Sequence, residues 1–223
     1  MTGRRLGLLS LALCLLGSAA PAIGADIQDH IFSGTKFANE KKYKEAAREF
    51  RVALGIDPDH AEANLLLGLT LANTGELEEA VQYSRKAVAL KPSYAGYYNL
   101  ALIHSNQGRY DEAIEAYRQA LELNPKSYQA WHQLGKVHST TLEFEKAIEA
   151  YQKAAGLNPK FPDAYQGLGS AYYWSGNLTA ALQQVDELHK LGFDGKADEL
   201  QRWIKDKEAK KKKAVKKAEK TSG

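Results

Sequence analysis

The sequence predicts an all-α protein built from five consecutive helix pairs, and two regularities support this prediction. Four prolines, Pro58, Pro92, Pro125 and Pro159, follow one another at intervals of 33 or 34 residues. Small residues recur along the chain with the same period. Self-similarity at this period is typical of stacked supersecondary units, and about 34 residues accommodate two short helices with two turns.

The small residues predict where the helices cross. When each unit is numbered so that its proline is position 32, three positions are small in nearly every unit. Position 8 holds Gly34, Gly68, Ala101, Gly135 and Gly169, position 20 holds Ala46, Ala80, Ala113, Ala147 and Ala181, and position 27 holds Ala53, Ala87, Ala120 and Ala154. Antiparallel helices approach closely only where small side chains meet. Large residues at position 24, such as Phe50, Tyr117 and Tyr151, are expected to fill the remaining space.

The turns within and between the pairs are also marked. Gly75, Gly108 and Gly176 lie between the two helices of a pair, where a positive φ angle is often required. The fourth unit has Leu142 in place of this glycine. The prolines stop the second helix of each pair, because proline lacks the N–H that a helix interior needs.

On these columns and this spacing, the chain resembles the tetratricopeptide-repeat (TPR) family over residues 27 to about 193. The resemblance implies a right-handed superhelix of five helix-turn-helix repeats, at residues 27–60, 61–93, 94–127, 128–161 and 162–193. It also implies a scaffold that binds another protein or peptide. Atypical first and last repeats are expected, since each end of an array exposes one face to water.

The segment after the repeats divides into two parts. Ala197, Leu200, Trp203 and Ile204 lie on one face at helical spacing, so residues 197–208 are predicted to form a helix that caps the fifth repeat. A free partner-binding helix remains the alternative. Residues 209–223 are read as a lysine-rich tail, and residues 205–223 together carry nine lysines against three acidic residues.

The N-terminus has the pattern of a secretory signal peptide, predicted here at residues 1–25. Arg4 and Arg5 precede an apolar run, which is followed by small residues. Cleavage after Ala25 or Ala22 would fit, and a retained anchor or acylation at Cys14 are the alternatives. We therefore expect an exported, periplasmic protein with no transmembrane span once the signal is removed. Cys14 is the single cysteine, so the mature chain would form no disulfide.

No catalytic or metal-binding motif is recognisable, and we expect neither enzymatic activity nor a cofactor. His104 and His138 share position 11 of successive repeats. A core histidine in place of a larger aromatic residue is favoured there over a metal or proton site.

The resemblance implies that positions 2, 5, 6, 9, 12 and 13 of the first helices face a concave groove that holds the partner. Its earlier part is apolar and its later part polar, with asparagines placed to bind a peptide backbone. The residues so assigned are Ile31, Phe32, Leu65, Leu66, Leu69, Asn73, Tyr98, Asn99, Leu102, Asn106, His132, Gln133, Lys136 and Tyr173. Some of them would instead only pack helix against helix. TPR domains that clamp a C-terminal carboxylate use a set of Lys, Asn and Arg, of which only Asn99 matches here.

The lysine-rich tail allows two interpretations: a solvated end, or a segment attracted to an anionic envelope polymer or lipid surface. The lysines assigned to such binding are Lys210, Lys211, Lys212, Lys213, Lys216 and Lys217. Nucleic acid is disfavoured, because the protein is expected to be exported and the tail has no aromatic residue for base stacking. The function expected first is therefore a protein-binding scaffold of the envelope. The alternative is a polyanion-binding protein acting through the tail.

Overall fold

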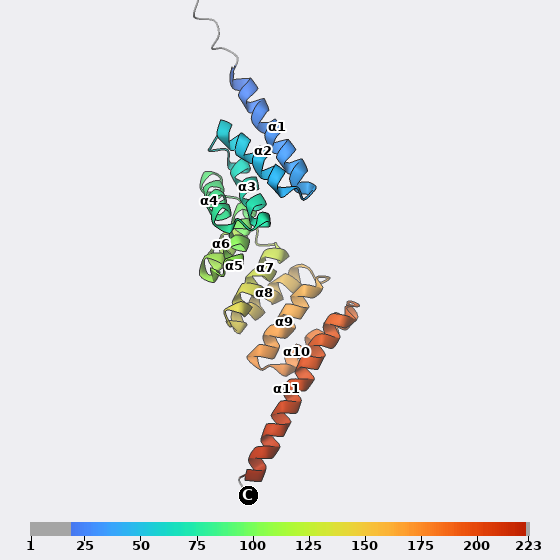
Figure 1. Ribbon diagram of the computed structural model, residues 1–223. Helices are drawn as coiled ribbons and strands as arrows, with labels where there is room; N and C mark the ends of the chain where they lie inside the picture. Colours follow the sequence, from blue (N-terminus) through green and yellow to red (C-terminus); the bar gives the residue numbers. More distant parts are fainter. Residues whose placement is uncertain (1–18, 222–223) are drawn as a thin grey trace, which may run out of the picture. The chain divides into compact units, whose positions relative to one another are not determined.

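The computed structural model describes residues 19–221, and within this range the chain forms eleven helices and no strand (Figure 1). The helices are α1 (Ala19–Asn39), α2 (Tyr43–Ile56), α3 (Ala61–Thr74), α4 (Leu77–Leu90), α5 (Tyr94–Asn106), α6 (Tyr110–Leu123), α7 (Tyr128–Thr140), α8 (Phe144–Leu157), α9 (Pro162–Ser175), α10 (Leu178–Lys190) and α11 (Asp194–Thr221). The predicted all-α repeat fold is confirmed.

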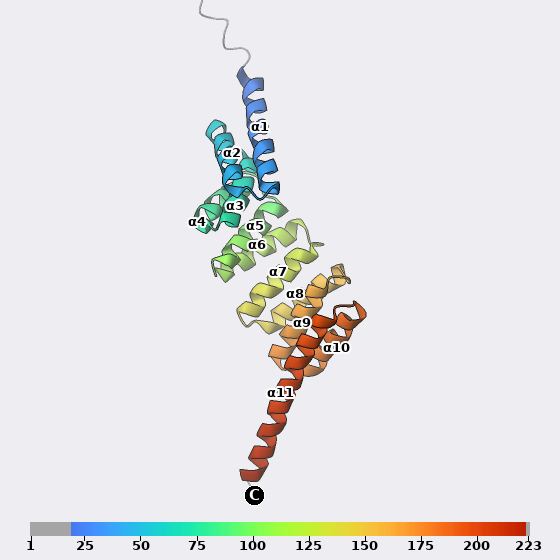
Figure 2. The ribbon, with the colours of Figure 1, turned by 45° about the vertical axis from the view of Figure 1, so that its right-hand side comes forward.

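The chain divides into two compact units, residues 1–91 and 92–223. In the N-terminal unit α1 packs on α2, α2 on α3 and α3 on α4, and α1 also contacts α3. In the C-terminal unit each helix from α5 to α11 packs on the next. In that unit α7 also contacts α9, and α9 contacts α11. Figures 1 and 2 show the helices of this unit following one another in chain order.

The turn inside each helix pair has the same backbone conformation in all five repeats. Its central residue, at position 15, is left-handed: φ is 60° at Lys41, 89° at Gly75, 73° at Gly108, 62° at Leu142 and 91° at Gly176. Glycine adopts this conformation without steric cost, whereas a side chain makes it unfavourable. Lys41 and Leu142 therefore occupy positions at which the fold itself favours glycine.

The small residues at the helix crossings behave as predicted. All five alanines at position 20 are fully buried. A Cβ atom built on Gly34 would lie 2.6 Å from the Phe50 ring, and one on Gly135 would lie 2.9 Å from the Tyr151 ring. These distances are shorter than van der Waals contact, so Phe50 and Tyr151 can occupy their places because Gly34 and Gly135 have no side chain.

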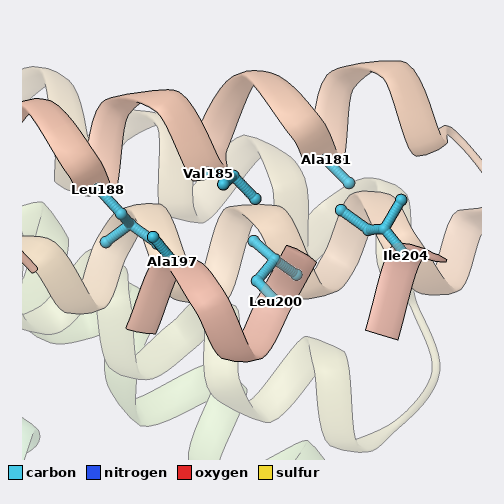
Figure 3. Packing of buried hydrophobic residues seen from close by; sticks show 6 residues of the cluster. All are labelled: Ala181, Val185, Leu188, Ala197, Leu200 and Ile204. Atoms are coloured by element: carbon cyan, nitrogen blue, oxygen red, sulfur yellow. The ribbon is translucent and has the colours of Figure 1, made fainter. Parts of the chain in front are cut away.

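The C-terminal helix α11 covers the last repeat. Ala197, Leu200 and Ile204 are at most 2% exposed and pack against Ala181, Val185 and Leu188 of α10. Figure 3 shows the two sets of side chains facing each other. Trp203 differs from the expectation: it is 38% exposed, because it lies at the edge of the buried face rather than on it.

The helix is also longer than the predicted residues 197–208. It begins at Asp194 and runs to Thr221, through the segment predicted as a tail, and in Figure 1 its C-terminal part extends beyond α9 and α10. No glycine or proline interrupts residues 196–221, and alanine, lysine and glutamate are good helix formers.

The predicted signal peptide falls mainly on residues 1–18, which lie outside the described residues. The described chain begins with α1 at Ala19, so both predicted cleavage positions, Ala22 and Ala25, lie within this helix. Among the described residues, no helix combines the length and the hydropathy needed to cross a membrane.

Candidate partner-binding site

The first helices of the N-terminal unit present an apolar surface. Phe32 on α1 is 73% exposed and Leu69 on α3 is 39% exposed, while Leu65 is half-buried. Ile31 does not belong to this surface, contrary to the sequence prediction. It is only 6% exposed, because it lies on the same side of α1 as Ile27 and packs in the core.

Two other predicted residues of this unit are partly occupied by the fold. Leu66 is half-buried against the same core cluster, so part of its side chain supports α1 and α2. The Asn73 amide donates a hydrogen bond of 2.8 Å to the Leu69 carbonyl oxygen of its own helix. Phe32, Leu65 and Leu69 are therefore the residues of this surface best placed to contact a partner.

In the C-terminal unit, the predicted residues of α5 lie at or near the surface. Tyr98 is half-buried, stacks on Tyr94 at 5.6 Å between ring centroids and meets Tyr117 edge-on at 5.8 Å. Burial raises the pKa of Tyr98, so its hydroxyl stays protonated at neutral pH. Asn99, Leu102 and Gln133 are half-buried, and Asn106 is exposed.

A pocket of about 510 Å³ opens between α7 and α9. One wall comes from α7 and carries His132, Lys136 and Ser139. The opposite wall comes from α9 and carries Asp163, Gln166, Gly167, Ser170, Ala171 and Trp174. Tyr151 of α8 also lines it, with Leu142 and Phe144 from the turn and the start of α8. The pocket thus lies at groove positions of the fourth and fifth repeats.

Gly167 explains why this junction is hollow. It occupies position 6, where the other repeats carry Phe32, Leu66, Asn99 and Gln133. A Cβ atom at Gly167 would lie 2.5 Å from Cε1 of Tyr151. Glycine on α9 therefore does two things: it makes room for the Tyr151 ring, and it leaves the space above that ring without a side chain.

The charges in the pocket are unevenly compensated. Lys196 of α11 forms an ion pair with Asp163 and donates a hydrogen bond of 2.6 Å to the Gln166 side-chain oxygen. The ammonium group of Lys136 is exposed and makes no hydrogen bond or ion pair with any described residue. Burial lowers the pKa of His132, which favours the neutral imidazole at neutral pH. The uncompensated charge of the pocket is therefore that of Lys136.

Two large apolar side chains flank the opening. Leu142 is 71% exposed and Trp174 is 60% exposed. The turn that carries Leu142 is tied down by a 2.7 Å hydrogen bond between Nδ1 of His138 and Glu143, and Lys146 also pairs with Glu143. Leu142 replaces a turn glycine, and its position 15 is not among the positions that the repeat pattern assigns to the binding surface.

Tyr173, also predicted to face the partner, is engaged by α11. The Lys207 ammonium lies 4.3 Å from the centre of the Tyr173 ring and donates a 2.5 Å hydrogen bond to the Tyr173 carbonyl oxygen. Tyr173 in turn packs edge-on against Trp174, with 5.1 Å between ring centroids. It therefore supports Trp174, while the indole of Trp174 is the more exposed of the two.

Within residues 19–221, no group of three or more His, Cys, Asp or Glu side chains is arranged to hold a metal ion. His104 and His138 are 2% and 4% exposed. His138 is bonded to Glu143, which agrees with its interpretation as a histidine of the core. A second pocket, of about 510 Å³, lies among α6, α7 and α8 and is lined by Arg118, Trp131 and Lys153 and by Glu122 and Glu149. Its mixed charges do not select one kind of ligand.

The lysines assigned to polyanion binding lie on the distal part of α11. The side chains of Lys211, Lys212 and Lys213 are exposed, as is that of Lys210. The side chains of Lys216 and Lys217 lie outside the described part of the chain.

Helix pairs that repeat every 33 or 34 residues and pack on one another in chain order define the class of helical-repeat proteins. Models of the tetratricopeptide repeat match residues 36–95, 94–127 and 116–149, and a TPR-repeat model matches residues 143–176. The chain belongs to the tetratricopeptide-repeat family.

Solved structures agree with this assignment. A crystal structure of MamA protein is 30% identical and superposes with a TM-score of 0.71, covering 75% of this chain and 92% of that one. YrrB, described as a TPR protein with an unusual peptide-binding site, is 19% identical with a TM-score of 0.70, covering 83% and 98%. The likeness to YrrB shows the fold alone.

Curated relatives match over shorter stretches. The peroxisomal targeting signal receptor of Kluyveromyces lactis is 36% identical over 110 residues, which are 49% of this chain and 19% of the receptor. Hsp70-Hsp90 organizing protein 3 of Arabidopsis thaliana is 30% identical over 95 residues, 42% of this chain and 17% of that protein. Human protein O-mannosyl-transferase TMTC3 is 32% identical over 108 residues, which are 12% of its length. The chain thus spans less than a fifth of these relatives, and the match indicates a shared repeat scaffold.

Proposed function

We propose that this protein is a non-catalytic scaffold of the cell envelope that holds a segment of a partner protein against the first helices of its repeats. The observation that carries this proposal is the pocket between α7 and α9. Its volume of about 510 Å³ is in the range of ligand sites, roughly 300–1,000 Å³, and it combines apolar walls with a few polar groups.

The apolar surface of the N-terminal unit supports the same proposal. Large exposed side chains such as Phe32 and Leu69 are costly to leave in water, and anchors of this kind carry much of the energy of protein–protein contacts. Each unit thus offers a surface on its first helices. That of the N-terminal unit is apolar, and that of the C-terminal unit is a pocket with more polar groups.

The envelope location is proposed from the N-terminal sequence, where Arg4 and Arg5 precede an apolar run and a stretch of small residues. Release of the periplasmic fraction from host cells, followed by N-terminal sequencing of the purified protein, tests it. A mature N-terminus after Ala22 or Ala25 is expected. Full-length protein in the cytoplasmic fraction would contradict the location but not the binding function.

Site-specific photo-cross-linking in host cells tests the binding function. A photoreactive residue placed at Ser170, inside the pocket, is expected to capture a partner protein that mass spectrometry identifies. The same residue at Lys126, an exposed position in the turn between α6 and α7, is the matched control. Adducts that are absent at Ser170, or identical at both positions, would overturn the proposal.

A second candidate function rests on α11. The helix continues to Thr221 and exposes Lys210 to Lys213 in succession, a cluster that would attract an anionic polymer or lipid surface. In this reading the tail binds and the repeats serve as a spacer.

Truncation separates the two candidates. The chain should end after Glu208, because Lys207 contacts Tyr173 and an earlier end would disturb the fifth repeat. Full-length protein is then expected to bind anionic phospholipid vesicles at low salt and to be released from them at high salt. The truncated chain is expected not to bind the vesicles at either salt concentration. Salt-sensitive binding that survives the truncation would exclude the tail as its cause.

A further inference from the structure

The pocket between α7 and α9 has a definite chemical character, and that character limits what it can hold. We propose that it takes a peptide segment in which a bulky apolar side chain lies next to an acidic side chain, with the apolar group against Leu142, Phe144 and Trp174 and the side-chain carboxylate on Lys136. This inference rests on the proposed function and names the ligand class of the same site.

Leu142 is the first argument for the apolar half. It stands at position 15, where three of the five repeats have glycine and where its own φ angle of 62° is unfavourable for any side chain. Its side chain is 71% exposed, so packing within the chain recovers little of this cost. Residues in sparsely populated backbone conformations are concentrated at binding sites. Leu142 differs from Lys41, whose φ angle is nearly the same, in that it lines the pocket.

Trp174 is the second argument for the apolar half. Its indole is 60% exposed although it is among the largest side chains of the protein, and it lines the same pocket as Leu142. Tyr173 holds it from one side by an edge-on contact, so the ring is positioned before any ligand arrives. A rigid exposed aromatic ring binds at a low cost in conformational entropy.

The charges that line the pocket favour an anionic group on the ligand. Asp163 carries the one acidic group lining the pocket, and Lys196 of α11 neutralises it. Lys136 has no such partner, so the pocket as a whole has a net positive charge at its α7 wall. Charge complementarity therefore selects an anion, and a carboxylate is the anion that a peptide supplies.

The C-terminal carboxylate of a partner is the competing source, but of the Lys, Asn and Arg set that clamps such a terminus in TPR domains only Asn99 is matched here. A side-chain carboxylate and a C-terminal carboxylate would present the same oxygens to Lys136, so peptides with each kind of carboxylate are compared. The probes are synthetic fluorescent peptides with one phenylalanine next to a glutamate, each made with a free and with an amidated C-terminus. Matched peptides carry glutamine or lysine in place of the glutamate. Binding to the full-length protein is measured by fluorescence anisotropy.

The glutamate peptides are expected to bind about tenfold more tightly than the glutamine peptides, and the lysine peptides weakest. Lys136→Gln should remove this preference, whereas Lys160→Gln, at an exposed turn outside the pocket, should keep it. Tighter binding of the free than of the amidated peptides, without any preference for glutamate over glutamine, would identify the terminal carboxylate as the bound group and overturn the assignment to a side chain.

Leu142→Gly tests the apolar half, since glycine suits the left-handed turn and the leucine side chain is 71% exposed. Affinity for the phenylalanine peptides is expected to fall about three- to tenfold. Lys41→Gly, the same change at the same turn position in the first repeat, should leave affinity unchanged and serves as the matched control.

Two results are to be distinguished. If peptides bind but show no preference for glutamate, or if Lys136→Gln and Leu142→Gly bind like the native chain, the ligand class is wrong and the binding function stands. If no peptide of any class binds and Ser170 captures no partner, both the ligand class and the proposed function fall.

Discussion

The first repeat and the junction of the fourth and fifth repeats use the same scaffold to make opposite surfaces. At position 24, Phe50 packs on Gly34 in the first repeat, and Tyr151 packs on Gly135 in the fourth. At position 6 the two regions diverge, because the first repeat has Phe32, which is 73% exposed, and the fifth has Gly167, which has no side chain at all. One region therefore bears a protruding apolar ring and the other a hollow.

The difference shows that a single groove position decides the character of the surface, while the buried columns stay the same. The alanines at position 20 are fully buried in both regions. Partner chemistry can thus change from repeat to repeat without loss of the helix packing, since the two sets of positions are separate on each helix.

The largest effect is expected from closing the hollow with Gly167→Ala. The added Cβ atom would lie 2.5 Å from the Tyr151 ring, which must move within a packed core. The free energy of unfolding should fall by about 1–3 kcal/mol. Gly156→Ala on α8, where a Cβ atom meets nothing within 4 Å, should instead stabilise the chain by roughly 0.5–1 kcal/mol. Urea unfolding followed by circular dichroism measures both, and equal effects would show that the close approach of Gly167 and Tyr151 is unimportant.

The repeat scaffold was predictable from sequence because its determinants are local and periodic. The small residues at position 8, the alanines at position 20 and the turn at position 15 recur every 33 or 34 residues. The same regularity located several pocket residues, including His132 and Lys136, because positions 5 and 9 of the first helices in the fourth and fifth repeats line the pocket.

The parts that sequence reasoning missed depend on contacts between distant segments. Lys196 neutralises Asp163 from 33 residues away, across α9 and α11, and no periodic pattern records such a pair. The burial of Ile31 depends on how α1 rotates against α2 and α3, which the repeat numbering alone does not fix. Leu142 carried a readable signal, since it broke the glycine column, but its exposure beside a pocket was visible only in three dimensions.

A middle-sized effect is expected at the two turns that lack glycine. Leu142→Gly removes the unfavourable left-handed conformation of a side chain that is 71% exposed, so the free energy of unfolding should rise by about 1 kcal/mol. In a chain of this size that corresponds to roughly 2–4 °C in Tm. Lys41→Gly should give a similar gain, because its φ angle of 60° is nearly the same.

Differential scanning calorimetry of the two variants sharpens the comparison between the regions. Similar stabilisation by both changes, with loss of peptide affinity only in Leu142→Gly, would mean that the fourth repeat retains its strained leucine for binding. A destabilised Leu142→Gly variant would show instead that the leucine side chain supports the fold.

The smallest effect concerns the bonds that hold the Leu142 turn, which the first repeat lacks. Hydrogen bonds from Lys146 and then His138 lower the pKa of Glu143 to about 2, from its usual value of 4.5. Because the folded-state pKa is depressed, the carboxylate stabilises the fold fully above about pH 4.5 and loses this contribution as the pH falls toward 2.

Glu143→Gln should therefore be less stable than the native chain at pH 7, by less than about 1 kcal/mol since the side chain is 36% exposed. The gap between the two urea midpoints should stay constant down to about pH 5 and then narrow. Glu145→Gln, at an exposed position in the first turn of α8, should show no such narrowing of the gap. A gap between the urea midpoints that is unchanged at pH 3 would mean that the Glu143 carboxylate does not hold this turn. The left-handed conformation of Leu142 would then be maintained by backbone hydrogen bonds, such as the 2.9 Å bond that the Glu143 amide donates to the His138 carbonyl oxygen.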